Sequence, residues 1–175
     1  QGEGGQVHFT PRSDLETELY LWLREKTENV SAEEVISGRG LENIYRFLAR
    51  KENFLDKTED GNPFSAKDIG EAALRGDERC IKAVKLMFGI LGTVAANGVL
   101  TNGCWGGLVI AGGITPKLIE LFKESPFWHN FSRHEVYQGL LKRVSVYIFS
   151  DPLGGLKGAQ LAFRETLEKN NLGKF

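Results

Sequence analysis

The sequence contains few cysteines and no excess of charge of one sign, and each shortage excludes a class of protein. The two cysteines, Cys80 and Cys104, are too few for a disulfide framework or for a zinc site built of four cysteines. They fit a reducing compartment, where each is expected to be a small buried hydrophobic residue. The 22 basic and 23 acidic residues leave a formal net charge of −1. Because non-specific nucleic-acid binding depends on positive charge, we expect no nucleic-acid partner.

A hydrophobic run long enough to cross a bilayer is also missing. The longest run, residues 86–100, has fifteen residues and is interrupted by Asn97, whereas a spanning helix needs about 20 apolar residues. It predicts a helix of a protein core, and we expect no membrane partner. The one methionine, Met87, lies in the middle of the chain. Because residue 1 is not a methionine, we expect the chain to be part of a longer polypeptide.

Glycine is abundant instead, with 21 of 175 residues, and no repeat of fixed period accompanies it. The usual share of glycine is about 7%, so the excess indicates turns that bring backbone close to a ligand or to another segment. Gly89 and Gly92 lie inside a predicted helix, where each costs roughly 1 kcal/mol relative to alanine. They indicate the close approach of a neighbouring element.

Strand and helix patterns alternate along the chain. Apolar alternation or continuous apolar runs predict strands at residues 6–9, 30–37, 106–111 and 144–149. Helical spacing and capping residues predict helices at residues 13–26, around 44–48, at 65–74 and 77–101, from 116, and at 134–142 and 153–169, with a fraying tail at 170–175. The alternation indicates an α/β protein. Four strands are few for so many helices, so we expect further strands before residue 1.

Two groups of residues are candidates for binding. Glu3 stands among glycines, and its carboxylate could accept hydrogen bonds from two sugar hydroxyls, although spacing alone favours a solvated loop acid. Glu33 taken alone is a surface acid. A buried strand that ends in Gly112 and Gly113 could hold a planar or phosphorylated ligand against bare backbone. Tight packing of the strand against the following helix explains the same glycines equally well.

Other patterns carry no chemistry. His129 and His134 have no cysteine or acid beside them that would complete a metal-ligand set, so we expect no metal site. Nucleophile patterns such as Gly-x-Ser-x-Gly are absent from the sequence. The aromatic residues at 127–131 suit a core or an interface between subunits.

A series of short segments spans nearly the whole chain: residues 2–7, 9–11, 30–41, 43–46, 97, 106–114, 151–154 and 158–159. In this order, these segments resemble the bacterial-type glucokinase family, the hexose kinases of the actin-like ATPase fold. Each segment alone is weak, whereas the ordered set is specific. The resemblance implies a helix-rich α/β domain of the ribonuclease H-like (actin-like ATPase) class that is incomplete at its N-terminus. Residues 1–175 would be the C-terminal portion of the glucokinase large domain.

The resemblance also implies an activity, the phosphorylation of glucose to glucose 6-phosphate by ATP with Mg²⁺. In the family, two glutamates that correspond to Glu3 and Glu33 bind the sugar. A family histidine that also contacts the sugar corresponds to Gln6, which is a departure from the pattern. The turn formed by Ala111, Gly112 and Gly113 corresponds to the adenosine motif.

The family's catalytic aspartate lies in an N-terminal domain that has no counterpart in residues 1–175. We therefore assign no catalytic residue to this chain and expect it to be inactive alone. The resemblance also suggests that the protein is a homodimer, and we expect it to be cytoplasmic. The alternative is a sugar-binding sensor or regulatory module derived from a sugar kinase, which the replacement at Gln6 favours. An unrelated nucleotide-binding α/β domain would need the ordered motifs to be coincidental.

Overall fold

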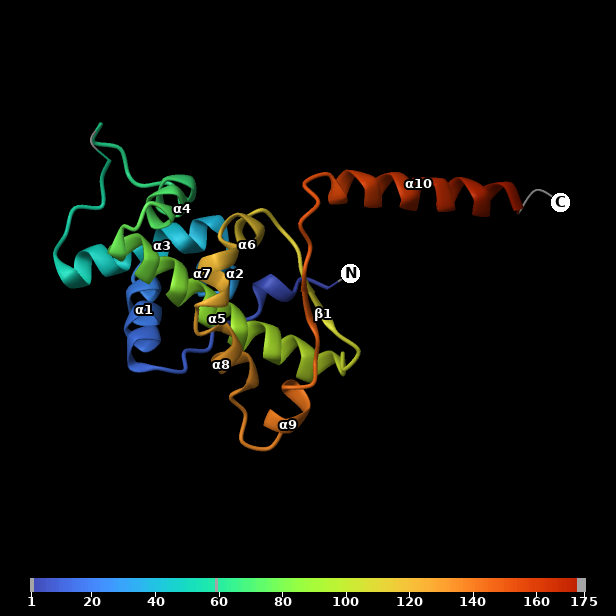
Figure 1. Cartoon of the computed structure of the whole chain (residues 1–175), viewed down its shortest axis with the longest axis horizontal. Helices are drawn as coiled ribbons and strands as arrows, with labels where there is room; N and C mark the ends of the chain where they lie inside the picture. The colour runs from blue at the N-terminus through green and yellow to red at the C-terminus, as the bar shows by residue number, and fades with distance from the viewer. Residues whose placement is uncertain (1, 59, 173–175) are drawn as a thin grey trace.

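The helices of the protein gather around one long central helix, and two strands form a small sheet at one side (Figure 1). The structure is a computed structural model that describes residues 2–58 and 60–172. In chain order its elements are the 3-10 turn η1 (Gly4–Gln6), α1 (Asp14–Arg24), α2 (Glu33–Ile36), α3 (Gly38–Glu52), α4 (Ala66–Leu74), α5 (Glu78–Asn102), β1 (Leu108–Ile110), α6 (Ile114–Lys117), α7 (Ile119–Lys123), α8 (Phe127–Ser132), α9 (Gln138–Leu141), β2 (Val146–Ile148) and α10 (Gly154–Leu172).

The central helix, α5, begins and ends where its capping residues dictate. The Asp77 carboxylate accepts hydrogen bonds from the backbone N–H groups of Arg79 (3.0 Å) and Cys80 (2.9 Å). Gly103, with φ of 64°, ends the helix in the left-handed conformation. The helix predicted at 77–101 is thus confirmed. By length and composition α5 could cross a membrane, but 61% of its most apolar window is buried inside the fold, as in the core helix of a soluble domain.

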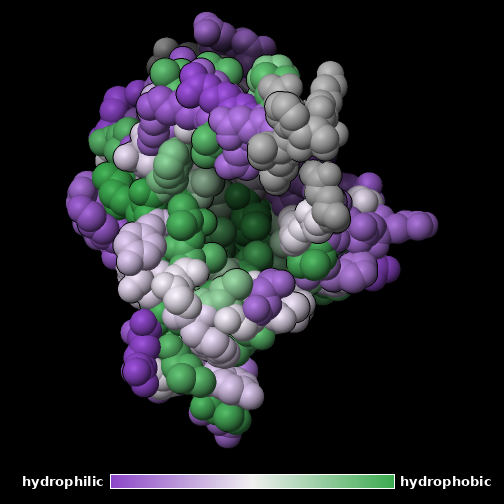
Figure 2. Space-filling model, turned by 90° about the vertical axis from the view of Figure 1, so that its right-hand side faces the viewer, coloured by the Kyte–Doolittle hydropathy of each residue, from purple (hydrophilic) through white to green (hydrophobic). Residues whose placement is uncertain are grey.

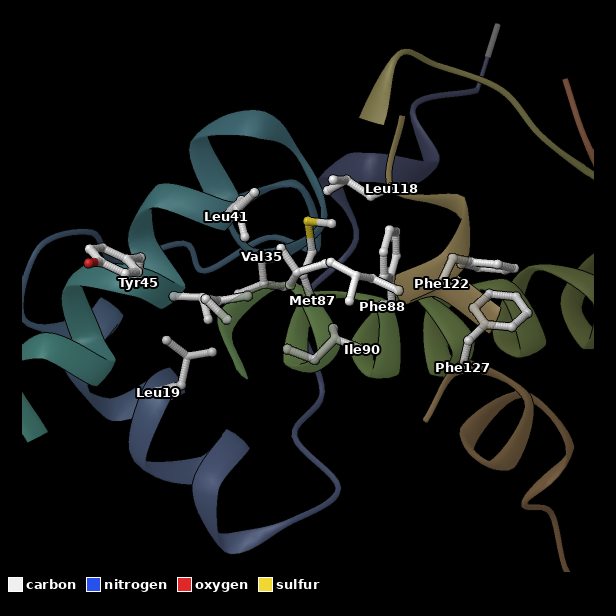
Figure 3. Close-up of a cluster of buried hydrophobic side chains, with 14 of the residues drawn as sticks. Leu19, Val35, Leu41, Tyr45, Met87, Phe88, Ile90, Leu118, Phe122 and Phe127 are labelled. Atoms are coloured by element: carbon white, nitrogen blue, oxygen red, sulfur yellow. The ribbon is translucent and has the colours of Figure 1, made fainter. Parts of the chain in front are cut away.

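The core forms where side chains of α5 meet the helices around it (Figure 3). Met87, Phe88 and Ile90 of α5 are almost fully buried. They belong to one cluster with residues from α1, α3, α7 and α8, including Leu19, Leu41, Phe122 and Phe127. Phe127 and Phe131 are 0% and 1% exposed, so these two take the core position, one of the two alternatives expected for the aromatics at 127–131.

The glycines inside α5 allow α8 to lie directly against it. A Cβ atom on Gly92 would stand 2.4 Å from the carbonyl oxygen of Phe127, and one on Gly89 would stand 3.2 Å from Asn130 Nδ2. The Asn130 amide donates a hydrogen bond of 2.9 Å to the Gly89 carbonyl. The predicted close approach at both glycines is confirmed.

Two further predicted helix starts are also confirmed. The Ser13 hydroxyl accepts from the backbone N–H of Glu16 at the start of α1. At the start of α4, Ser65 and Asp68 form a complete capping box, in which each side chain bonds the backbone N–H of the other residue.

The strands predicted at 6–9 and 30–37 are wrong. The two segments form a single antiparallel bridge between His8 and Ser31, flanked by η1 on one side and α2 on the other. The β-branched pair Val35–Ile36 suggests a strand, but Glu33 and Glu34 occupy the first turn of α2, where acidic side chains favour a helix.

The other two predicted strands exist, but they are short and half exposed. β1 pairs with β2 in parallel, with Val109 opposite Tyr147. Both of these residues are 59% exposed, so the expectation that 106–111 is a fully buried strand is wrong. The helix expected at 134–142 is confined to α9, and α8 was not predicted.

The last helix, α10, extends away from the body of the molecule (Figure 1). It continues beyond the predicted end at residue 169, so the expected tail is helical as far as Leu172, and residues 173–175 lie outside the described residues. Its apolar side chains are exposed, Leu156 at 71% and Phe163 at 64%. This helix is therefore held by little beyond its own hydrogen bonds.

Candidate functional site

The predicted sugar-binding residues lie around the corner where η1 meets α2. The backbone N–H of Gln6 donates to the carbonyl of Glu3 at 3.0 Å, which closes the turn that carries both side chains. The Gln6 Nε2 amide donates to Glu33 Oε2 at 2.5 Å. The structure thus brings Gln6 and Glu33 into direct contact, although 26 residues separate them in the sequence.

The position of Glu33 is fixed by its neighbours. The backbone N–H of Ala32 donates to the Val7 carbonyl at 2.8 Å, which ties the start of α2 to the segment after η1. A Cβ atom on Gly40 would stand 2.6 Å from the Val35 carbonyl carbon, so α3 packs directly against α2. The Ser37 hydroxyl joins the two helices, because it donates to the Glu33 carbonyl and accepts from the Gly40 N–H. The Glu33 carboxylate is exposed, while the backbone that carries it is held by these contacts.

Glu3 lines a cleft of about 520 Å³, here called the first cleft, between residues 2–10, the C-terminal half of α5, and Leu108. Its polar side chains include Glu3, His8, Thr93 and Asn97. The Thr93 hydroxyl is buried and has no hydrogen-bond partner among the described residues. The face of the molecule that contains the N-terminal residues, β1 and α10 is hollowed over hydrophobic residues (Figure 2).

A second cleft, of about 590 Å³, lies between α4 and α6. Gly113 lines it, with Lys67 and Glu71 on α4 and Lys117 on α6. Neither Ala111 nor Gly112 is among its lining residues, and all three residues of the predicted turn are exposed. Gly112 has φ of 122°, a conformation that other residues rarely adopt. A Cβ atom on Gly113 would meet nothing within 4 Å.

Sequence reasoning missed the contribution of α4 to the second cleft. Lys67 and Glu71 are one helical turn apart on an exposed face, which is an ordinary solvent pattern. No local signal could have indicated that α6, more than forty residues later in the sequence, would complete a cleft with them.

One histidine and one cysteine, His134 and Cys80, take structural positions. The His134 Nδ1 atom accepts hydrogen bonds from the backbone N–H groups of Val136 and Tyr137. Across residues 2–58 and 60–172, no group of three His, Cys, Asp or Glu side chains could hold a metal ion. Burial raises the pKa of the Cys80 thiol to about 12, so the thiol stays protonated and is not a nucleophile. Cys104 is exposed, so the expectation that both cysteines are buried is wrong for it.

The sequence model of the glucokinase family matches residues 1–166. The chain belongs to the glucokinase family. It is 37% identical to the glucokinase of Pectobacterium atrosepticum over 167 residues and 35% identical to that of Neisseria gonorrhoeae over 168 residues. Each alignment covers 95% of this chain and 50% of the relative, so the chain spans about half the length of the curated relatives that it matches.

Solved structures give the same result for the fold. The chain superposes on the crystal structure of a glucokinase from an Antarctic psychrotroph with a TM-score of 0.78 and 29% identity, over 87% of this chain and 46% of that one. It superposes on the glucokinase of Balamuthia mandrillaris in complex with glucose with a TM-score of 0.71 and 22% identity, over 86% and 43% of the two chains. The expected family and the α/β, actin-like ATPase fold class are therefore confirmed, and the family supports a sugar-kinase role.

Proposed function

We propose that this chain supplies part of the sugar site and the nucleoside pocket of a glucokinase that phosphorylates glucose with ATP, and that residues 1–175 are the C-terminal portion of its large domain. The observation that carries the proposal is the contact between Gln6 and Glu33 at the corner where the family resemblance expects the sugar. The Balamuthia mandrillaris glucokinase, which shares the fold, was solved with glucose bound.

The chemistry of this corner suits a sugar. A carboxylate accepts hydrogen bonds from hydroxyl groups. Glu33 contacts the Gln6 side chain, and Glu3 lies in the turn that also carries Gln6. The Gln6 amide donates to Glu33 through its nitrogen, which leaves its oxygen to accept from a further hydroxyl. The side chain can thus replace an imidazole as a donor and acceptor at once.

The second cleft suits the nucleoside of ATP. The absence of a side chain at Gly113 leaves bare backbone on one wall, against which a flat ring can lie. Glu71 offers an acceptor for ribose hydroxyls, and Lys67 and Lys117 offer positive charge at its rim. Mg²⁺ would reach the site bound to the phosphates of ATP.

Phosphoryl transfer needs both substrates positioned and the transferring charge stabilised. This chain offers sugar contacts and a nucleoside pocket, and we assign no catalytic base to it. We therefore propose that it has little activity alone. We also propose that the active protein is a homodimer, as the family resemblance suggests, and that it is cytoplasmic. Trp128, which is 45% exposed, is an aromatic residue that remains free to contact a second subunit.

Calorimetric titration of the chain with glucose, with mannose and fructose as competitors, tests the sugar site. We expect Glu33→Gln to weaken glucose binding at least tenfold, because a charge-assisted hydrogen bond contributes about 1.5–3 kcal/mol. The matched control is Glu28→Gln, an exposed carboxylate outside the corner, which should leave the affinity unchanged. Equal effects of the two substitutions on the glucose affinity would contradict the assignment.

The sensor alternative has one observation in its favour, the glutamine at position 6 where the family resemblance expects histidine. The two candidates differ in nucleotide binding. A glucokinase portion should bind ATP in the second cleft, and Gly113→Val should abolish this binding while leaving glucose affinity intact. A sensor that has lost catalysis should bind glucose. It should either bind no ATP or bind ATP equally well with and without Gly113→Val.

A further inference from the structure

Two adjacent glutamates begin α2, and the structure gives them different surroundings. Both oxygens of the Glu34 carboxylate are held by α3, because Oε1 pairs with Arg39 and Oε2 accepts from the Asn43 amide at 3.1 Å. One Glu33 oxygen, Oε2, accepts from Gln6 Nε2. The other, Oε1, accepts no hydrogen bond from any residue that the structure describes. Of the two acids, only Glu33 therefore keeps an oxygen without a partner for a ligand.

The helix α2 alone cannot fix the direction in which Glu33 points. It is a single turn of four residues, and its N-cap, Ala32, provides no side-chain hydrogen bond. A helix this short gains little from its own hydrogen bonds, because forming the first turn costs more than it returns. The last four carbonyls of any helix also lack partners within it, and α2 has only four. Its orientation is therefore set by contacts from outside the helix.

A buried donor on α3 supplies such a contact. Asn43 is 8% exposed and lies one turn after Gly40, on the face of α3 that packs against α2. Its Nδ2 atom donates at 3.1 Å to the Glu34 carbonyl and at 3.1 Å to Glu34 Oε2. Both acceptors are oxygens, so the nitrogen of the amide, with its two N–H donors, must face them. Asn43 thus holds both the backbone and the side chain of Glu34.

Holding Glu34 determines the direction of Glu33. Successive side chains of a helix point about 100° apart, so with Glu34 tied to α3 the Glu33 side chain is turned towards η1. There it lies on a glycine, since a Cβ atom on Gly5 would stand 3.7 Å from Glu33 Cβ and 3.8 Å from Glu33 Oε2. We propose that Asn43 is a positioning residue of the sugar site, which reserves Glu34 for the fold and leaves Glu33 for the ligand. The proposal rests on the proposed function, since it takes that ligand to be a sugar.

The side-chain amide of Gln6 reports the position of Glu33 without any ligand. In a ¹H–¹⁵N NMR spectrum of the protein, the amide proton that bonds Glu33 should appear downfield, in a signal that Gln6→Ala removes. Asn43→Asp keeps the size of the side chain and removes both donors, so it should move this signal to the position of a solvated amide. The same change at the exposed Asn29 should leave the signal where it is.

Two further variants separate positioning from folding. Asn43→Ser introduces no charge and keeps one donor on a shorter side chain, so it should move the Gln6 signal part of the way. Glu34→Gln added to Asn43→Asp exchanges donor and acceptor, because the new amide can donate to the new carboxylate. This double variant should recover most of the original position of the signal. A loss of packing at Asn43 would not be repaired by a change at Glu34.

Glucose titration of the same variants links the position of Glu33 to the sugar. We expect Asn43→Asp to weaken glucose binding about tenfold, and the double variant to bind nearly as well as the unaltered protein. A Gln6 signal that neither Asn43→Asp nor Asn43→Ser moves would overturn the positioning role. A displaced signal with an unchanged glucose affinity would support that role and contradict the assignment of Glu33 to the sugar.

Discussion

At the scale of single residues, glycine decides how closely the helices approach. Gly92 is buried in α5, where it weakens the helix, yet a Cβ atom there would stand 2.4 Å from the Phe127 carbonyl oxygen. The neighbouring atom is backbone and cannot rotate away. The close packing of α8 on α5 therefore depends more on the missing methyl group at Gly92 than on the one at Gly89, where the nearest atom is a side-chain nitrogen.

We expect Gly92→Ala to destabilise the chain by about 1–3 kcal/mol, as overpacking of a core does, despite the better helix propensity of alanine. Gly98 is the matched control on the same helix, because it is exposed and a Cβ atom there meets nothing within 4 Å. Gly98→Ala should stabilise the chain by up to about 1 kcal/mol. Urea denaturation measures both values, and a stabilising Gly92→Ala would show that α8 can move.

At the scale of elements, helix caps link stability to pH. The backbone N–H of Cys80 holds the pKa of Asp77 below its usual value, and the Ser65 hydroxyl does the same for the pKa of Asp68. A carboxyl whose pKa is lowered by folding contributes stability above its unfolded pKa, about 3.9 for aspartate. That contribution is lost as the pH falls through the folded pKa.

Asp77→Ala tests the cap of α5. We expect the free energy of unfolding at pH 7 to fall by about 1 kcal/mol, the usual cost of removing an N-cap. We also expect a shallower loss of stability between pH 5 and 2 (about the range in which a lowered aspartate titrates). Urea denaturation across this range measures it. An unchanged pH dependence would mean that Asp77 does not titrate differently in the folded and unfolded chain.

The elements also mark how far the sequence could predict this structure. Caps and apolar stripes are local signals, so α1, α4 and α5 were predicted nearly to the residue. The strand predicted at 30–37 failed for two reasons. The acidic first turn of α2 was outweighed by the β-branched pair that follows it, and the packing of α2 against Gly40 is a contact that no local pattern contains. The residues proposed to bind sugar came from family resemblance. Their convergence through the Gln6–Glu33 hydrogen bond appeared only in the structure.

At the scale of the whole molecule, apolar surface is distributed unevenly. The core around α5 is closed, whereas α10 and the outer face of the sheet stay open. The start of α10 is held by Asp151, which accepts from the Leu153 N–H and pairs with Lys157. The apolar residues Leu156 and Phe163 lie seven positions apart, on one face of the helix, and both are exposed.

Limited trypsin digestion should therefore attack α10 first. Most of the stability of a helix in a protein comes from tertiary packing, which α10 largely lacks. Cleavage at Lys157 or Arg164 should therefore precede cleavage at Lys85 of the buried helix α5. Mass spectrometry of the first fragments measures the order. Initial cleavage within α5 would contradict the conclusion that the core around α5 is well packed and that α10 is not.

The short strand β1 has a consequence for the distance between the two clefts. Leu108 at its start lines the first cleft, and Gly113, three residues after its end, lines the second. The length of the chain between these two residues limits the distance between the two clefts, because extended backbone advances about 3.3 Å per residue. Two residues inserted there would keep the alternation of the strand and leave each cleft its own lining. They would lengthen this connection by up to about 7 Å, so that groups held in the two clefts would lie farther apart.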